Sequence, residues 1–443
     1  MKPVDVSALV DDAPFSGFQK RLIAGAALMM VLDGLDNQLL PNAIPSMMRE
    51  WNLPRAAFAN ASAAAPFGMI FGGVIGGMLG DRVGRRVALI GSVLAFAVLT
   101  LALAFVDTVG ALTIIRFLAG VGLGGAMPNA AALASEYAPR RQRPLAVTLT
   151  IVCVPLGGFL AGLLAGQLVP ARGWRALFIG AGVLTIAIGV LSLKTLPESP
   201  RFLAGRRHRW EELRALLARL GHVVPADTPF VEPSTDSALA SRASIASLFT
   251  PALRRDTLGL MGAFTCCLLA IYTGFLWIPA MLTDPAVGFS QPSASYALSL
   301  FNVGGVAGAL AGAVVIQRLG SRIAMLGLSA FAVASALVMA GMPLNAAAPF
   351  ATMTMFTISG ALLNAVQTTM FALAAHVFPT TIRGTGVGTT MAVGRTGNVM
   401  ASYVGSWALS AGGPPFYFST WAAAMAIVFA SLAIIRRHIP RNN

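Results

Sequence analysis

The segment GGMLGDRVGRR, residues 76–86, places four charged residues within six positions between two long apolar runs. The runs on either side, 58–80 and 86–106, are each long enough to cross a bilayer, which takes about 20 residues. Gly84 allows a tight turn between two helices. Arginines in a short loop are typical of the cytoplasmic side of a membrane protein. The segment therefore predicts a helical hairpin that crosses a membrane twice, with its loop in the cytoplasm.

The composition of the 443-residue chain extends this pattern to the whole protein. Apolar residues make up 56% of it and charged residues 11%, against about 25% charged residues in soluble domains. The net charge of +14 comes from arginines clustered between apolar runs, which argues against a nucleic-acid partner. We expect an all-α membrane protein with twelve transmembrane helices. The expected spans are 22–45, 58–80, 86–106, 110–137, 145–169, 174–196, 256–283, 292–316, 321–342, 347–378, 385–411 and 415–436.

The arginines alternate between the two sides of this expected bundle. One set of loops, together with the C-terminal tail, is rich in arginine: Arg82, Arg85, Arg86, Arg140, Arg141, Arg143, Arg201, Arg206, Arg207, Arg209, Arg318, Arg322, Arg383, Arg436, Arg437 and Arg441. The other set holds only Arg49, Arg55, Arg172 and Arg175. The positive-inside rule then predicts that both termini lie in the cytoplasm, and we expect a monomer in a bacterial inner membrane.

Two loops of the chain resemble each other at a fixed spacing. The segment SEYAPRRQRPLAV, 135–147, aligns with AHVFPTTIRGTGV, 375–387, so that Arg143 matches Arg383 at a spacing of 240. The charged segment 79–86 aligns less closely with 315–322. Two six-helix halves in the same orientation form a parallel repeat, and such proteins bind their substrate at the interface of the halves near the bilayer midplane.

The repeat divides the chain into three parts. Residues 1–196 and 256–443 form the two six-helix halves, and 197–255 form a polar linker. Within the linker, 210–221 has apolar residues at helical spacing and ends on a glycine, which predicts a short amphipathic helix at the cytoplasmic surface.

Two acids interrupt the first apolar span. The run AALMMVLDGLDNQLLPNAIP, 26–45, contains Asp33 and Asp36, which are three residues apart and therefore share one face of a helix. An ionised carboxylate within the membrane costs at least about 2.5 kcal/mol. Burial and a like-charged neighbour both favour the protonated form of at least one acid. The pair is a candidate for proton binding or substrate positioning, and which acid carries the proton stays open. The alternative is a bond to backbone or to a basic helix that only holds the bundle together.

A single arginine interrupts the eleventh expected span. Arg395 is flanked by Gly394 and Gly397, small residues that leave room for a ligand. A guanidinium matches a carboxylate with two parallel hydrogen bonds, so Arg395 is a candidate for binding a substrate carboxylate. A first-span aspartate is its expected counterion when no substrate is bound. The alternative is a permanent ion pair between the two halves.

Several motifs resemble those of the major facilitator superfamily. The loop 76–86 is similar to its signature loop, RFLAGVGLGGAMPN at 116–129 to its fourth-helix motif, and PESPRFL at 197–203 to the segment after its sixth helix. Within the superfamily, DGLDNQ in the first span and VGRTGNVMASYVG at 393–405 resemble the aromatic acid:proton symporter family. This resemblance implies proton-coupled import of a benzoate-type or related organic acid by alternating access.

The resemblance also implies roles for residues near the loops. Arg116 becomes the fourth-helix motif arginine, which influences protonation, although its position near the end of the span also fits a side chain that reaches the membrane surface. The signature loop closes the cytoplasmic side through contacts that break and re-form during transport. The candidate gating residues are Asp81, Arg82, Arg86, Glu136, Arg143, Glu198, Arg201 and Arg383.

The seventh and eighth helices often line the cavity in this superfamily, so their aromatic and amide residues are candidates for substrate binding. Together with polar residues of the first and tenth spans they give the following set beside Asp36 and Arg395: Gln38, Tyr272, Trp277, Phe301, Asn302, Asn364 and Gln367. Each of these residues could equally serve packing alone.

Other functions remain open from the sequence. A porter for a nicotinate-like acid, a sugar or an exported drug is one alternative, and a sensor without transport is another. A sugar site has no need of a central arginine, and the glycine spacing of PLGG at 155–158 departs from the antiporter motif of drug exporters. No nucleotide-binding loop, metal-ligand cluster or nucleophile triad is visible, so we expect neither an enzyme nor a metal or cofactor.

Overall fold

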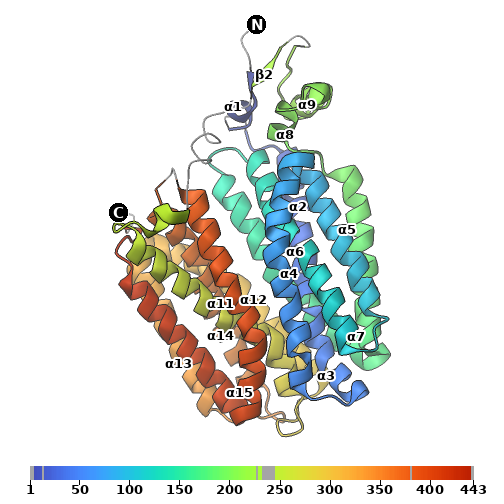
Figure 1. The fold of residues 1–443 in the computed structure, drawn as a ribbon, viewed down its shortest axis with the longest axis vertical. Helices are drawn as coiled ribbons and strands as arrows, with labels where there is room; N and C mark the ends of the chain where they lie inside the picture. Colours follow the sequence, from blue (N-terminus) through green and yellow to red (C-terminus); the bar gives the residue numbers. More distant parts are fainter. Residues whose placement is uncertain (1–3, 12–13, 226–227, 232–244, 380–381, 441–443) are drawn as a thin grey trace.

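The computed structural model describes residues 4–11, 14–225, 228–231, 245–379 and 382–440. These residues form two helical bundles that stand side by side (Figure 1). The first half contains β1 (Val4–Asp5), α1 (Val6–Asp11), α2 (Gly17–Asn37), α3 (Leu39–Trp51), η1 (Arg55–Phe58), α4 (Ala59–Val83), α5 (Arg85–Leu103), α6 (Val109–Tyr137) and α7 (Arg143–Thr195). The connection contains α8 (Pro200–Ala204), η2 (Arg207–Arg209), α9 (Trp210–Arg219), β2 (Phe230–Val231) and η3 (Ile245–Phe249). The second half contains α11 (Arg254–Leu282), α12 (Gln291–Leu319), α13 (Ser321–Gly341), α14 (Phe350–Val377) and α15 (Arg383–Ile434).

The described helices account for twelve membrane crossings. Ten helical segments are long and apolar enough to cross a membrane, and the first of them joins α2 and α3. Two of the ten, α7 and α15, are each interrupted by a glycine in the left-handed region, Gly173 with φ of +77° and Gly413 with φ of +63°. Each of these two helices therefore crosses twice. The expected all-α fold with twelve spans is confirmed, although the first helix pair begins at Gly17 and ends at Trp51, beyond both expected limits.

The repeat is visible in the helix breaks and in the packing. Gly173 and Gly413 stand at the same spacing as the aligned loops, and α7 and α15 begin at the aligned Arg143 and Arg383. Within the first half α4 packs on α6, and within the second half α12 packs on α14. A Cβ atom on Gly72 would collide with the backbone of Val121, and one on the equivalent Gly308 would collide with that of Ala361. Glycine thus permits the same close helix packing in both halves.

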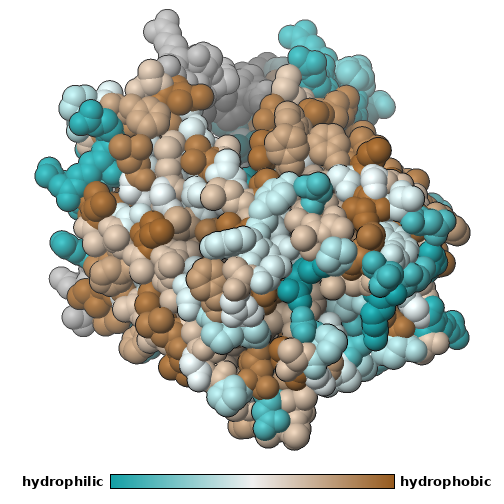
Figure 2. Space-filling view, turned by 60° about the horizontal axis from the view of Figure 1, so that its bottom comes forward, coloured by the Kyte–Doolittle hydropathy of each residue, from teal (hydrophilic) through white to brown (hydrophobic). Residues whose placement is uncertain are grey.

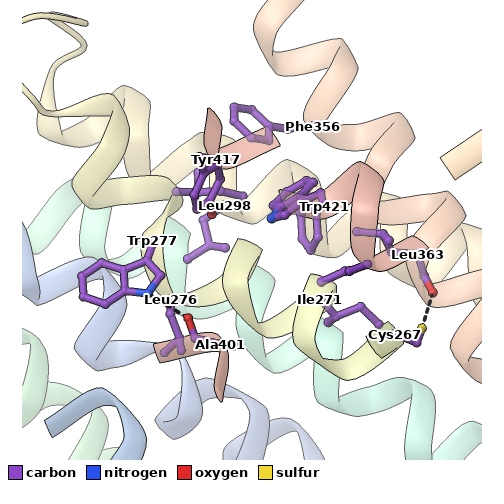
Figure 3. Close-up of a cluster of buried hydrophobic side chains, with 14 of the residues drawn as sticks. Cys267, Ile271, Leu276, Trp277, Leu298, Phe356, Leu363, Ala401, Tyr417 and Trp421 are labelled. Carbon is purple, nitrogen blue, oxygen red and sulfur yellow. Dashed lines mark hydrogen bonds between the residues drawn. The ribbon is translucent and has the colours of Figure 1, made fainter. Parts of the chain in front are cut away.

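The core of the second half is rich in buried aromatic side chains (Figure 3). Trp277 Nε1 donates a hydrogen bond to the Ala401 carbonyl at 3.3 Å, and the Tyr417 hydroxyl donates to the Thr273 carbonyl at 2.7 Å. Trp421 packs against Tyr417, with ring centroids 5.5 Å apart. Buried tryptophan and tyrosine need such partners for their polar atoms, and backbone carbonyls of neighbouring helices supply them for Trp277 and Tyr417.

The first and last described segments of the chain, 4–11 and 435–440, lie toward one end of the bundle, which we call the terminal end, while α3 lies at the opposite end (Figure 1). At the terminal end β1 pairs in parallel with β2, so that Val4 lies beside Phe230. The expected amphipathic helix is present as α9. Its apolar residues Leu213 and Leu217 are fully buried in a cluster that includes Val10 of α1. Protein therefore covers the apolar face of α9, and its place at the cytoplasmic surface stays a prediction.

The division of the chain at residues 196 and 256 stays a prediction. Residues 232–244 of the expected linker lie outside the described part of the chain.

Candidate functional site

A cavity lies between the two halves. Helices α2, α4, α6 and α7 contribute to its wall from the first half, and α11, α14 and α15 contribute from the second. Seven of the lining residues are apolar: three methionines, two phenylalanines, a leucine and a valine. The polar lining residues are Asp33, Asn37, Tyr272, Gln367, Arg395 and Asn398. An apolar cavity with a few polar groups of opposite charge suits a small amphipathic ion.

Asp33 faces this cavity from α2. Its side chain is 3% exposed, and no described residue forms a hydrogen bond with its Oδ1 atom. Within the described chain no arginine, lysine or histidine nitrogen lies within 4 Å of its carboxylate. A carboxylate that is buried without a partner is costly, so Asp33 is poised either to take a proton or to interact with a cation that approaches in the cavity.

Arg395 faces the same cavity from α15. Its Nη1 atom donates a hydrogen bond to the Met69 carbonyl of α4 at 2.7 Å, which links the two halves. No carboxylate of the described residues lies within 4 Å of the guanidinium, although its charge interacts with that of Asp33 at longer range. A guanidinium has five N–H donors, so one hydrogen bond to a carbonyl leaves most of its donors available to a ligand.

The glycines beside Arg395 serve helix packing. A Cβ on Gly397 would collide with the Thr265 carbonyl, and one on Gly394 would lie 2.9 Å from Cβ of Phe264. The expectation that they leave room for a ligand is therefore wrong, because α11 occupies that room. The residue that gives the guanidinium space is Gly73 of α4, where a Cβ would lie 3.4 Å from Nη1 of Arg395.

Asp36 lies in a different environment from Asp33. Its Oδ2 atom is 3.5 Å from Nη1 of Arg116, and Thr100 donates a hydrogen bond to its Oδ1. The side chains of Asp36 and Arg116 are 2% and 3% exposed, so Arg116 does not reach the membrane surface. Residues three apart on a helix differ by about 60° in direction. Since α2 is surrounded by protein near its end, this difference places Asp33 at the cavity and Asp36 against α5 and α6.

Five of the predicted polar and aromatic residues lie elsewhere. Gln38 and Asn302 bond each other across the halves at 2.9 and 2.7 Å. Asn364 donates to the Gly360 carbonyl of its own helix at 2.9 Å. Phe301 packs between Phe275 and Trp421.

Trp277 belongs to the same aromatic core as Phe301, because its ring is fully buried and its Nε1 atom is bonded to a backbone carbonyl. Of the predicted binding residues, Tyr272, Gln367 and Arg395 line the cavity. Asn37 and Asn398 line the cavity too. Neither was predicted as a binding residue, although both belong to segments that contain predicted residues, DGLDNQ and VGRTGN.

A charged network at the terminal end joins the signature loop to α6 and α8. Asp81 forms an ion pair with Arg85, and Arg85 Nε lies 3.7 Å from Oε1 of Glu136. Ser199, the N-cap of α8, donates a hydrogen bond to Glu136. The interaction partner of Asp81 thus lies in its own half.

Glu198 occupies the turn between α4 and α5. The backbone N–H of Arg86 donates to its Oε1 at 2.9 Å, and the Tyr137 hydroxyl donates to its backbone carbonyl at 2.6 Å. Gly84 has φ of +114°, and a Cβ there would collide with the Glu198 carboxylate. Gly84 is therefore required both for the turn and to leave space for the Glu198 carboxylate.

The remaining gating candidates surround this network. Arg143 bonds Asp11 and donates from Nε to the Ser135 carbonyl at 2.8 Å. The Arg82 carbonyl accepts a hydrogen bond from Arg206, Arg201 lines a polar pocket with Glu136, and Arg383 is exposed at the start of α15.

The two halves are joined between the cavity and the opposite end. Arg55 forms an ion pair with Asp284 at 2.9 Å, and Gln291 donates to the Asn42 carbonyl at 2.8 Å. Within the described residues, no hydrogen bond or ion pair joins the halves on the terminal side of Arg395. Figure 2 turns the opposite end forward and shows hydrophilic residues that interrupt a largely apolar surface. The ion pair of Arg55 with Asp284 and the hydrogen bond from Gln291 to Asn42 thus close the cavity toward the opposite end.

Comparisons with known proteins agree with this architecture. Residues 26–285 match the Major Facilitator Superfamily. A gallate transporter from Pseudomonas putida is 34% identical, with 98% of this chain and 96% of the relative covered. The 4-hydroxybenzoate transporter PcaK from Pseudomonas putida is 32% identical, with 93% and 91% covered. A benzoate transport protein from Acinetobacter baylyi is 28% identical, with 94% and 89% covered.

Solved structures share the fold at lower identity. A bacterial homolog of the human lysosomal transporter Spinster, inward-facing and occupied, has a TM-score of 0.70 at 14% identity, with 95% of this chain and 96% of that chain covered. The xylose transporter XylE from E. coli, partially occluded and inward open, has a TM-score of 0.70 at 17% identity, with 94% and 97% covered. With the profile match and the relatives above, these findings place the chain in the major facilitator superfamily, a family of membrane transporters and not of enzymes.

Proposed function

We propose that this protein imports aromatic carboxylates together with protons by alternating access. The observation that carries the proposal is the placement of Asp33 and Arg395 on opposite halves around one largely apolar cavity. An arginine can hold a carboxylate through two parallel hydrogen bonds, and methionine and phenylalanine side chains can cover a ring. The relatives named as transporters of gallate, 4-hydroxybenzoate and benzoate support this class of substrate.

Asp33 is the residue that we propose to carry the proton. While Asp33 is ionised, its charge and that of Arg395 attract each other across the cavity. A substrate carboxylate that binds Arg395 brings a second negative charge toward Asp33, which favours the protonated form of Asp33. The proton and the anion thus favour each other's binding. Asp36 and Arg116 form a fixed pair that holds α2 in the first half.

The orientation follows from the charge distribution. We place the terminal end in the cytoplasm of a bacterial cell, because the arginine-rich loops lie there. In this orientation the described state has its cavity closed toward the outside. We further propose a monomer in the inner membrane without a nucleic-acid partner, and a division into two six-helix halves, 1–196 and 256–443, joined by a cytoplasmic linker, 197–255.

The experiment is uptake of radiolabelled 4-hydroxybenzoate into proteoliposomes, with and without an inward proton gradient. We expect accumulation above the external concentration only with the gradient, and its loss on adding a protonophore. Arg395→Ala should lose uptake, while Arg322→Ala, at an exposed position of α13, should not. Asp33→Asn should lose accumulation and keep exchange of labelled for unlabelled substrate, with exposed Glu211→Gln as its control.

Two results would overturn the proposal. Undiminished uphill accumulation by Asp33→Asn would remove Asp33 from proton coupling. Normal affinity of Arg395→Ala for 4-hydroxybenzoate would show that the carboxylate is held elsewhere.

A further inference from the structure

The end of the cavity that faces the opposite end of the bundle carries a group of polar atoms that the carboxylate and proton sites do not use. Asn37 follows Asp33 by one helical turn, and Asn398 follows Arg395 by one turn, about 4.5 to 6 Å along each helix. Both α2 and α15 run from the terminal end toward the opposite end at these positions. Asn37 and Asn398 therefore lie on the same side of the charged pair, deeper in the cavity.

Tyr272 completes this group from α11. Its side chain lines the same cavity as those of Asn37 and Asn398. The ring of Tyr272 packs against that of Phe275, with ring centroids 5.4 Å apart. Phe275 packs in turn against Phe301, with ring centroids 5.5 Å apart. The hydroxyl therefore has a fixed position at the wall of the cavity.

Asn398 has an unused acceptor at this place. Its side chain is 4% exposed, and no described residue donates a hydrogen bond to its Oδ1 atom. Buried polar atoms are nearly always bonded, and those without a partner call for an explanation. Neither member of the charged pair supplies the donor in this state, since no hydrogen bond joins Asn398 Oδ1 to Arg395 or to Asp33 in the described part of the chain.

We propose, on the basis of the proposed function, that Asn398 with Tyr272 and Asn37 recognises a ring hydroxyl and thereby selects hydroxylated aromatic acids over unsubstituted ones. A carboxylate on Arg395 directs the ring and its para position away from the guanidinium. One helical turn deeper, a phenolic O–H can donate to Oδ1 of Asn398 while its oxygen accepts from Asn37 or Tyr272. A hydroxyl ortho to the carboxylate stays beside Arg395 and does not reach this group.

The test compares ligands on one protein. Purified protein is loaded with radiolabelled 4-hydroxybenzoate, and benzoate, 2-hydroxybenzoate and unlabelled 4-hydroxybenzoate compete for it. One hydrogen bond changes affinity by about 2- to 13-fold. We expect wild-type protein to prefer 4-hydroxybenzoate to benzoate by this factor, and to treat 2-hydroxybenzoate like benzoate.

The variants Asn398→Leu and Tyr272→Phe should reduce this preference, to about onefold for Asn398→Leu, mainly through weaker binding of 4-hydroxybenzoate. The ratio of two affinities does not depend on the fraction of protein that folds, so partial misfolding cannot imitate the result. An unchanged ratio in Asn398→Leu, or a gain from the ortho hydroxyl equal to that from the para hydroxyl, overturns the inference alone. Absence of saturable binding of all three acids to wild-type protein overturns the proposed function and the inference with it.

Discussion

Replacing Arg116 by methionine tests whether the buried pair in the first half is a fixed structural element. Methionine keeps most of the length of the side chain and removes its charge. Asp36 and Arg116 are both nearly inaccessible, with 3.5 Å between Oδ2 and Nη1. Without the guanidinium, Asp36 keeps the hydrogen bond from Thr100 and loses the charge that compensates its own. Breaking one side of a buried ion pair costs about 3–5 kcal/mol, so we expect the free energy of unfolding of Arg116→Met to fall by that amount.

The distance gives a similar magnitude. Two unit charges about 4 Å apart interact by about 4 kcal/mol at an effective dielectric constant of 20. Thr100→Val removes one hydrogen bond to a charged group and should cost about 1.5–3 kcal/mol. The double variant Asp36→Asn/Arg116→Met removes both charges, so it should recover most of what Arg116→Met loses.

The assay is unfolding by titration with sodium dodecyl sulfate in detergent micelles, followed by circular dichroism. A thiol-reactive dye gives a second signal, because Cys153, Cys266 and Cys267 are free and lie within α7 and α11. A double-mutant cycle then gives the interaction energy of the pair. Additive effects of Asp36→Asn and Arg116→Met would refute the reasoning. If the double variant folds like wild type and fails to accumulate substrate, the pair takes part in coupling and is not merely structural.

Three further changes test the ends of the bundle. Arg55→Gln removes the ion pair with Asp284. A thiol reagent added from the opposite end should then label a cysteine introduced in the cavity more strongly. Unchanged labelling would mean that this pair does not hold the cavity closed. Gly84→Ala strains a left-handed backbone and displaces Glu198, so it should cost about 1–3 kcal/mol in unfolding free energy, and a loss below about 0.5 kcal/mol would contradict this account. Burial lowers the pKa of His438 below its ordinary value, so the C-terminal segment binds fewer protons when docked than when free. Docking of this segment should therefore weaken as the pH falls through about 6.5. The measurement is hydrogen exchange over 435–440, which should become faster at low pH after correction for the intrinsic exchange rate. His438→Gln should abolish this pH dependence.

Much of the fold could be predicted because its signals are local or repeated. The turn at Gly84 follows from one glycine among arginines, and the spacing of 240 between Arg143 and Arg383 reappears in the breaks at Gly173 and Gly413. The burial of Asp33 and Arg395 follows from the cost of charge in lipid. Each of these inferences needs only the sequence and the bilayer.

The partners of these charges could not be predicted in the same way. Asp36 could face either the cavity or Arg116. The outcome depends on which helix packs on each side of α2, and the sequence of α2 alone does not encode that arrangement. The ion pair of Arg55 and Asp284 depends in addition on which end of the cavity is closed. Asn398 escaped prediction for a different reason, because an asparagine in a span more often serves packing than binding.

Two kinds of helix contact in this protein differ in how easily they can change. Within each half, glycines such as Gly72 bring helix backbones so close that any sliding would produce collisions, and dispersion contacts hold the seam along its length. Across the halves, α4 and α15 are joined by single polar contacts, among them Arg395 with the Met69 carbonyl and the Tyr403 hydroxyl with Asn60 at 3.0 Å. A ligand carboxylate or water can replace a carbonyl as the partner of an arginine without opening a void. The physical expectation is that each half moves as a rigid body, and that the seam carrying Arg395 is the one that a bound anion can loosen.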